Sequence, residues 1–274
     1  MLRQYHPEAV ICTQAMPAIA MAEHKKRGHL KVPLICAVTD FGVHSYWYHP
    51  EVDLYLVAHE DIKKEMIEKG IPESKIRATG IPVDPKYGET SDPYKVRNKM
   101  RINPLKKTVL VMGGSHGLGS LDEIVTSLKT IPTSFQAVIV CGKNKSMFKK
   151  ISKITKDLDH FYAIGYTKDL SNLMGAADIL ITKPGGLTTS EALAKQLPMI
   201  LTNPIPGQEE RNVQFLTKHG AARVVRNNED LVHQVSDLLR HPKKTSTMKQ
   251  RARMIGKPYA AWEAARSIFS LVNR

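Results

Sequence analysis

The chain has 274 residues, 42% of them hydrophobic, and its 40 lysines and arginines against 26 acidic residues give a formal net charge of +14. This length can bury a sizeable core and is sufficient for two domains of ordinary size. No run approaches the roughly 18–20 apolar residues of a membrane-spanning helix. Cys12, Cys36 and Cys141 have neither metal-ligand spacing nor a plausible disulfide pattern, so we expect buried, reduced thiols in a cytoplasmic protein without a metal site.

The positive charge is concentrated in the second part of the chain. Residues 1–88 hold 11 basic and 11 acidic side chains, so residues 89–274 carry the whole excess. Two basic clusters stand out: Lys143, Lys145, Lys149, Lys150, Lys153 and Lys156, then Arg240, Lys243, Lys244, Lys249, Arg251, Arg253 and Lys257. Basic surfaces attract anionic lipid and nucleic acid, but neither cluster interleaves aromatic residues on which bases could stack. We expect either an anionic membrane surface as partner or a solvated helical face, and no nucleic acid.

Residues 1–88 alternate between strand and helix patterns. Strands are predicted at 9–13, 34–38, 54–58 and 76–79, and helices at 16–27 and 60–69. Such alternation implies a parallel sheet. The polar, proline-bounded segment 85–93 is the predicted linker.

The alternation restarts more regularly at residue 107. Strands are predicted at 108–112, 137–141, 161–164, 179–182 and 199–202, and helices at 121–129, 145–156, 169–175 and 188–195. Helical stretches are expected from Glu209 onward. The last of them, 260–272, is amphipathic.

The segment 182–212, TKPGGLTTSEALAKQLPMILTNPIPGQEERN, has the most informative pattern. Pro184, Gly185 and Gly186 end a strand, and three hydroxyl residues and Glu191 follow at the predicted helix start. Backbone N–H groups at a helix start are open to an anion, and the helix dipole favours negative charge there. Glu191 would repel a phosphate placed directly on it, but it suits neutral hydroxyls such as those of a ribose. The alternative interpretation is an ordinary turn followed by a solvated acid.

A second loop, NPIPGQEE at 203–210, makes a binding site the better interpretation. It puts the side chains of Gln208 and Glu209 beyond the carboxyl end of the strand at 198–202. That is the edge at which open α/β sheets bind ligands.

Together, KPGG…T..EA and P.PGQE..N resemble the nucleotide-sugar site of one glycosyltransferase family. This family includes the lipid-II-forming murein transferase, the plant monogalactosyldiacylglycerol synthases and the bacterial processive diacylglycerol glucosyltransferases. The diacylglycerol branch is the nearest, because the murein branch usually has an Arg-x-Gly-Ala turn where this chain has residues 183–186. The resemblance covers essentially the whole chain and implies an α/β fold of the GT-B type, with two Rossmann-like domains that contain parallel sheets.

The resemblance also implies a domain plan. Residues 1–88 would form a partial acceptor-side domain, residues 89–258 the UDP-sugar-binding domain, and residues 259–274 a helix that crosses back to the first domain. A full family member begins with a strand, a glycine-rich loop containing a Gly-His pair, and a long helix. Here Met1 falls before the middle of that domain, so we expect the first domain to be incomplete, its general-base histidine to be missing, and transfer to be impaired. An incomplete sheet should leave an unpaired edge near residues 9–13 or 34–38.

Donor-binding roles follow from the same resemblance. They fall on Gly114, Ser115, Gly142, Lys183, Gly185, Gly186, Thr188, Glu191, Gln208, Glu209 and Asn212. Glu191 would hold the ribose hydroxyls, Gln208 and Glu209 the sugar hydroxyls, and Asn212 would support their loop. Without a metal motif, backbone amides at 114–115 and 185–188 would meet the charge of the leaving UDP. No cofactor is expected besides the UDP-sugar, which is a substrate.

Acceptor-side candidates lie in residues 39–47, TDFGVHSYW, which match a T-D-x-x-x-H-x-x-W segment of the family. Asp40 and His44 are the catalytic candidates, because they could orient an acceptor hydroxyl or take its proton. Trp47 would lie on the acceptor side. The alternative interpretation is a structural aspartate and a surface histidine.

A rival class is suggested by residues 113–117, GGSHG, which match the G-x-S-x-G elbow of α/β-hydrolases and would make Ser115 the nucleophile of a serine esterase. Asp178 lies at the start of its strand and His219 at the end of a helix, where a triad cannot use them. A non-enzymatic alternative is a fragment that binds UDP-sugar or membrane without turnover.

We therefore predict an inverting hexosyltransferase of glycolipid synthesis. The donor would be UDP-glucose or UDP-galactose, and the acceptor diacylglycerol or glycosyl-diacylglycerol. The protein is expected to be cytoplasmic and peripheral on the inner face of the cell membrane, with an anionic membrane surface as partner.

Overall fold

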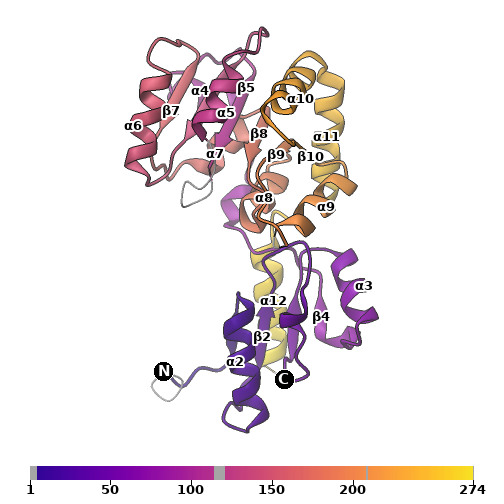
Figure 1. Ribbon diagram of the computed structural model, residues 1–274. Helices are drawn as coiled ribbons and strands as arrows, with labels where there is room; N and C mark the ends of the chain where they lie inside the picture. Colours follow the sequence, from indigo (N-terminus) through magenta and orange to yellow (C-terminus); the bar gives the residue numbers. More distant parts are fainter. Residues whose placement is uncertain (1–4, 114–120, 208, 274) are drawn as a thin grey trace. The chain divides into compact units, whose positions relative to one another are not determined.

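The computed structural model describes residues 5–113, 121–207 and 209–273, and the chain divides into two compact units (Figure 1). Unit 1 comprises Met1–Pro85 and Lys257–Arg274, and unit 2 comprises Lys86–Gly256. The first boundary, after Pro85, falls three residues before the predicted boundary after residue 88. The second boundary, after Gly256, falls two residues before the predicted boundary after residue 258. Gly114, Ser115 and Gln208, which were predicted to bind the donor, lie outside the described residues.

Unit 1 contains a four-stranded parallel sheet in the order β1-β2-β3-β4. Its elements are β1 (Val10–Cys12), α2 (Ala15–Lys26), β2 (Leu34–Ala37), β3 (Leu54–Leu56), α3 (Glu60–Glu68), β4 (Ile76–Arg77) and α12 (Ala260–Val272). The expected edge strand is β1, where Ile11 is half exposed. The other strand proposed for that edge, β2, is paired on both sides, between β1 and β3.

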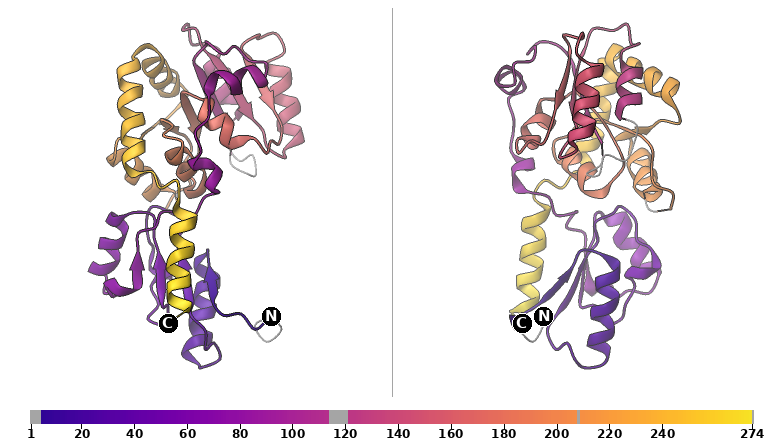
Figure 2. Two further views of the ribbon diagram at one scale, coloured as in Figure 1. Left: turned by 180° about the vertical axis from the view of Figure 1, so that it is seen from behind. Right: turned by 60° about the vertical axis from the view of Figure 1, so that its left-hand side comes forward.

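The C-terminal helix α12 belongs to unit 1 and runs along its sheet in both views of Figure 2. Residues at alternate positions of a strand share one face of the sheet, and Ile35 of β2 and Leu54 of β3 lie on the face that α12 covers. Ala264, Ile268 and Leu271 of α12 pack against this face. Burial of these apolar side chains therefore holds the end of the chain on the first unit.

Unit 2 contains a six-stranded parallel sheet in the order β10-β9-β8-β5-β6-β7. Its strands are β5 (Thr108–Met112), β6 (Gln136–Val140), β7 (Phe161–Ile164), β8 (Ile179–Thr182), β9 (Met199–Leu201) and β10 (Ala222–Val224). Its helices are α4 (Pro93–Lys99), α5 (Leu121–Leu128), α6 (Lys145–Ile154), α7 (Leu170–Ala176), α8 (Gly186–Ala194), α9 (Glu210–Lys218), α10 (Asn228–Arg240) and α11 (Pro242–Ile255). The chain reverses its direction across the sheet between β5 and β8, and α/β sheets bind ligands at the carboxyl end of such a switch point.

Several helices of unit 2 begin where a side chain caps the first free N–H groups. The Asp92 carboxylate accepts from the amides of Tyr94 and Lys95, directly before Pro93, the first residue of α4. Asn144 caps α6 in the same way. Asx caps and an N1 proline are the expected signals of a helix start.

Three predictions of local structure were wrong. The segment 85–93 is not wholly a linker, because a 3-10 turn forms at Pro85–Gly88 and α4 begins at Pro93. The region after Glu209 is not only helical, because β10 extends the sheet beyond β9. Helix α8 begins at Gly186 and not at Thr188, because the backbone already turns after the extended Gly185. None of the described helices has the length and apolar character needed to cross a bilayer.

Candidate functional site

The Gly-Gly turn after β8 lies at the carboxyl edge of the unit 2 sheet, beside the switch point. Gly185 has extended backbone angles (φ −69°, ψ 139°) and caps α8. The first N–H groups of a helix have no carbonyl partner within it, so the amides of the first turn from Gly186 remain available for an anion. Lys183 is half-buried beside this turn. The arrangement can therefore receive a phosphate group through backbone donors and the positive end of the α8 dipole.

The first turns of α8 also place the predicted hydroxyl and carboxylate groups. Thr188 and Glu191 are three positions apart and so share one face of the helix, and both are half-buried. Thr189 is buried and its hydroxyl donates to the Gly185 carbonyl over 2.8 Å, which ties this side chain to the helix itself. The Ser190 hydroxyl is buried without a hydrogen-bond partner among the described residues. Of these polar residues, Thr188 and Glu191 are therefore the two whose side chains could contact a ligand bound at the turn.

The loop after β9 is fastened to the Gly-Gly turn by Asn212. The side chain of Asn212 is fully buried and its amide donates to the carbonyl oxygen of Pro184 over 2.9 Å. Because Pro184 precedes Gly185, this bond fixes the turn against the first part of α9. Sequence reasoning assigned Asn212 a supporting role for its own loop, whereas this bond reaches across to the neighbouring loop.

Glu209 occupies the N-cap position of α9, and its carboxylate bonds to the preceding loop. Its side chain is only 9% exposed, and Oε2 accepts the backbone N–H of Ile205 over 2.8 Å. A Cβ atom added at Gly185 would lie 3.7 Å from the other oxygen, Oε1. One oxygen of Glu209 therefore shapes the loop, and the other faces the Gly-Gly turn.

The turns after β6 and β7 meet at the same edge of the sheet. Gly142 has a positive φ of +58°, which glycine adopts without strain, and a Cβ atom added at Gly165 would lie 3.9 Å from the Gly142 carbonyl oxygen. The Lys143 ammonium lies 5.5 Å from the centre of the Tyr166 ring. Gly142 thus lies in a close pair of turns two strands away from β8.

In unit 1, the loop that carries the catalytic candidates is held by a buried tyrosine that the sequence analysis did not identify. The Tyr55 hydroxyl, on β3, lies 2.9 and 3.0 Å from the carbonyl oxygens of Trp47 and His49, which share its single proton, and it accepts from the His49 amide over 2.9 Å. Burial raises the pKa of Tyr55 well above its usual range, so the hydroxyl keeps its proton. This anchor fixes the end of the loop.

Within this loop, His44 is exposed and Asp40 is half-buried. The His44 ring lies edge-on to Tyr46, with 5.5 Å between ring centres, and 6.2 Å from the ring of Trp47. Trp47 itself is only 3% exposed, and its indole N–H has no acceptor among the described residues. The His44 side chain is therefore accessible to a ligand, whereas the Trp47 side chain is buried.

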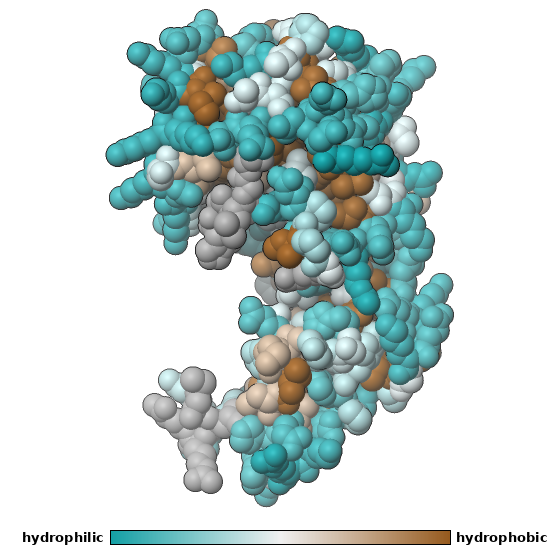
Figure 3. Space-filling view, viewed as in Figure 1, coloured by the Kyte–Doolittle hydropathy of each residue, from teal (hydrophilic) through white to brown (hydrophobic). Residues whose placement is uncertain are grey.

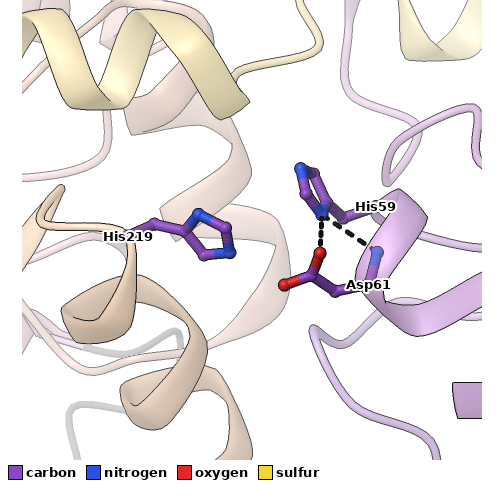
Figure 4. Close-up of side chains that lie close together, drawn as sticks. All are labelled: His59, Asp61 and His219. Carbon is purple, nitrogen blue, oxygen red and sulfur yellow. Dashed lines mark hydrogen bonds and ion pairs between the residues drawn. The ribbon is translucent and has the colours of Figure 1, made fainter. Parts of the chain in front are cut away.

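His59 is a second histidine at the carboxyl end of the unit 1 sheet, and sequence reasoning missed it. It caps α3, where its Nδ1 accepts the Asp61 amide over 3.2 Å and lies 3.4 Å from the Asp61 carboxylate (Figure 4). The signal available in the sequence was a polar residue directly before the acidic first turn of a helix.

The rival hydrolase triad finds no support in the placement of Asp178. Its carboxylate accepts from Arg97 and Lys107, each over 2.9 Å, and from the Thr108 amide over 2.8 Å, at the amino edge of the sheet. Ser115 lies outside the described residues. No cluster of three metal-ligating side chains forms within the described residues of unit 2 taken alone.

The two basic clusters lie on α6 and around α11. The lysines of the first cluster are all exposed, and Lys150 pairs with Asp122 at 2.5 Å. In the second cluster, the Lys244 ammonium forms an ion pair with the Asp237 carboxylate, with 2.7 Å between Nζ and Oδ1. The face shown in Figure 3 is mostly hydrophilic, with separate small patches of hydrophobic residues.

Comparison with known proteins identifies both parts of the chain. The family model described as monogalactosyldiacylglycerol (MGDG) synthase matches residues 1–83, and the glycosyltransferase family 28 C-terminal domain matches residues 108–263. The processive diacylglycerol beta-glucosyltransferases of Bacillus mycoides and Bacillus anthracis are each 36% identical over 263 residues, which cover 95% of this chain and 67% of theirs.

Solved structures resemble the fold. MurG of Acinetobacter baumannii is 17% identical with a TM-score of 0.73, over 98% of this chain and 75% of that one. HepE of Anabaena in complex with UDP is 15% identical with a TM-score of 0.65, over 98% of this chain and 80% of that one. The expected α/β fold with two parallel sheets is confirmed.

Proposed function

This chain belongs to the glycosyltransferase family that combines an MGDG synthase region with a family 28 C-terminal domain, and on this basis we propose that it transfers a hexose from a UDP-sugar to diacylglycerol or glycosyl-diacylglycerol. The single observation that carries the donor assignment is the Gly185–Gly186 turn fastened by Asn212 and faced by Glu209. The hexose is glucose or galactose. The acceptor is presented by an anionic membrane surface, on the cytoplasmic face of the cell membrane.

In this proposal the leaving UDP is stabilised by backbone donors. The first-turn amides of α8 and the α8 dipole meet the negative charge that develops as the glycosidic bond to UDP breaks. Glu191, one turn further along, accepts hydrogen bonds from the ribose hydroxyls. Lys183, Gly142 and the loop of Gly114 and Ser115 complete the nucleotide contacts.

The sugar is held by the loop after β9. Glu209 Oε1 faces the Gly-Gly turn and, together with Gln208, accepts hydrogen bonds from sugar hydroxyls. The hydrogen bond from Asn212 to Pro184 holds this loop against the turn. An acceptor hydroxyl then attacks the anomeric carbon on the side opposite to UDP, with inversion. Its proton passes to a base on the acceptor side, for which His44 with Asp40 is the proposed pair because His44 is exposed and its loop is anchored by Tyr55.

Gly185→Ala is the sharpest test of this function. The backbone φ of −69° suits any L-residue, and the added methyl group would make only an ordinary 3.7 Å contact with Glu209. The variant should therefore melt like the parent protein. If a phosphate approaches this backbone closely, the methyl group should weaken UDP binding about tenfold or more, or ~1.4 kcal/mol.

Two measurements are needed. Isothermal titration with UDP, UDP-glucose, UDP-galactose and UDP-GlcNAc tests the donor site in both proteins, and release of UDP in the presence of phospholipid vesicles that contain diacylglycerol tests transfer. Equal UDP affinity of the variant and the parent would reject the Gly-Gly turn as the phosphate site. Absence of UDP binding to the parent protein would reject the function.

A further inference from the structure

A separate pocket lies at the amino edge of the unit 2 sheet, on the opposite edge from the Gly-Gly turn. Its volume is about 230 Å³. Lys107 precedes β5, Asp178 precedes β8, Lys195 follows α8, and Lys249 is on α11; all four line the pocket. Because the strands are parallel, residues that precede them meet at one edge, which brings these distant positions together.

The lining has an excess of positive charge. Among the described lining residues Asp178 is the only acid, and that carboxylate is already shared by Lys107 and Arg97, each at 2.9 Å. Lys249 is exposed and makes no ion pair with any described residue. An anion in this pocket would therefore meet more positive charge than the Asp178 carboxylate neutralises.

Lys195 adds a cation that is bonded to neutral oxygens. Its ammonium donates to the Glu89 carbonyl over 2.7 Å and to the Lys86 carbonyl over 3.3 Å. Burial lowers its pKa, as expected of a partly desolvated ammonium without a carboxylate in contact. Nearby negative charge would relieve this cost.

One serine and two leucines are the other lining residues that bear on a ligand. Ser246, in the first turns of α11, adds an exposed hydroxyl near the positive end of this 14-residue helix. Leu197 and Leu238 supply a buried apolar floor. The pocket therefore combines cationic and hydroxyl groups at its rim with apolar surface inside.

We propose that this pocket binds a phosphate-bearing ligand, with the phosphate held by Lys249, Lys107 and the Ser246 hydroxyl, and with a short apolar portion against Leu197 and Leu238. The phosphate can come from a free phosphate ester or from the headgroup of a phospholipid. This site is distinct from the proposed donor site, which lies at the other edge of the sheet. Its test therefore stands apart from the test of sugar transfer.

A fluorophore placed beside the pocket reports occupancy without removing a proposed ligand. The native cysteines are all buried, so a variant with Thr247→Cys, an exposed position of α11 that does not line the pocket, can be labelled selectively with an environment-sensitive dye. The full chain is titrated at physiological ionic strength with inorganic phosphate, glycerol 3-phosphate, dihexanoyl phosphatidic acid and, as a zwitterionic control, dihexanoyl phosphatidylcholine. UDP is kept saturating in one series and omitted in another, which separates this pocket from a phosphate at the Gly-Gly turn.

Lys249→Ala is the test variant, and Lys243→Ala is its matched control, because Lys243 is exposed on the same helix but does not line the pocket. Loss of a charged hydrogen bond should weaken binding about tenfold in Lys249→Ala, and the control should stay within about twofold. Calorimetry on unlabelled protein checks that the dye does not create the site.

The ligand series distinguishes the two sources. Saturable binding of glycerol 3-phosphate identifies a free phosphate ester, and saturable binding of phosphatidic acid alone identifies a lipid headgroup; either result supports the proposal. The proposal is overturned if no phosphate compound gives a saturable signal, if phosphatidylcholine binds as well as phosphatidic acid, or if Lys249→Ala and Lys243→Ala behave alike.

Discussion

The side-chain amide of Asn212 donates to the carbonyl oxygen of Pro184 over 2.9 Å, across 28 positions of sequence. The bond joins the first turn of α9 to the residue that precedes the Gly-Gly turn, and both groups are buried. A buried carbonyl that loses a side-chain donor does not readily regain the bond from water, so this contact should matter for both stability and ligand geometry.

Asn212→Leu should therefore destabilise the protein and weaken donor binding together. Leucine has a similar size but offers no donor, so the Pro184 carbonyl is left unpaired at a cost of about 1–3 kcal/mol in the free energy of unfolding. Chemical denaturation and UDP titration measure the two effects, with Asn228→Leu at an exposed position as control. An unchanged UDP affinity in a folded Asn212→Leu protein would mean that the turn does not depend on this bond.

Glu191→Ala should weaken UDP binding without a large change in the fold. Glu191 is half-buried on the face of α8 that also presents Thr188, and hydrogen bonds that involve a charged group contribute about 1.5–3 kcal/mol. Isothermal titration with UDP gives the difference, and Glu229→Ala, in the exposed first turn of α10, provides the control. Identical affinities for the two variants would remove Glu191 from the ribose site.

The exposed lysines of α6 should favour vesicles that contain anionic lipid. Each lysine close to an anionic surface contributes roughly 1 kcal/mol, so replacing Lys145, Lys149 and Lys153 with glutamine should weaken vesicle binding markedly. Binding of the parent should fall as salt rises past physiological strength, where the screening length is about 8 Å.

The matched control for the vesicle experiment removes the same charge elsewhere. Lys26, Lys64 and Lys95 are exposed and lie outside both clusters. Co-sedimentation with neutral and anionic vesicles distinguishes the variants. Equal losses in both triple variants would make the effect one of net charge, and equal binding of the parent to neutral vesicles would leave α6 as a solvated face.

Asp237 should make stability depend on pH in the acidic range. Hydrogen bonds from Lys244 and Arg223, at 2.7 and 2.8 Å, hold the pKa of this carboxyl far below its usual range. A carboxyl with a depressed folded-state pKa stabilises the protein above its unfolded pKa of about 3.9 and loses that contribution as pH falls further. Asp237→Asn should thus have a lower Tm than the parent at pH 7, and the gap should narrow below about pH 4.

Thermal melts of both proteins between neutral and strongly acidic pH measure this effect. Asp157→Asn, at an exposed aspartate, serves as the control. A gap that stays constant down to the lowest pH would show that Asp237 acts through packing and not through its charge.

Sequence patterns were reliable wherever structure depends on a few neighbouring residues. The apolar run of β8, the glycines that end it and the amphipathic α12 were predicted at or near their observed bounds. Predictions failed where contacts with distant parts of the chain outweighed a segment's weak preference for helix or strand. The three residues of β10 form a strand because they pair in register with β9, a stabilisation that lies outside the segment itself.

By itself, the sequence determined the strand–turn–helix unit at β8 and α8, since alternation of apolar runs with glycine and hydroxyl residues acts over a few positions. Only the tertiary structure decided that Asn212 reaches Pro184, that Tyr55 anchors the loop of Trp47, and that Lys249 and Lys107 share a pocket. Each of these contacts depends on which strands pair and on how the helices pack across them. The spacing of side chains along the sequence does not predict these contacts, because the segments that make them come together only in the folded sheet.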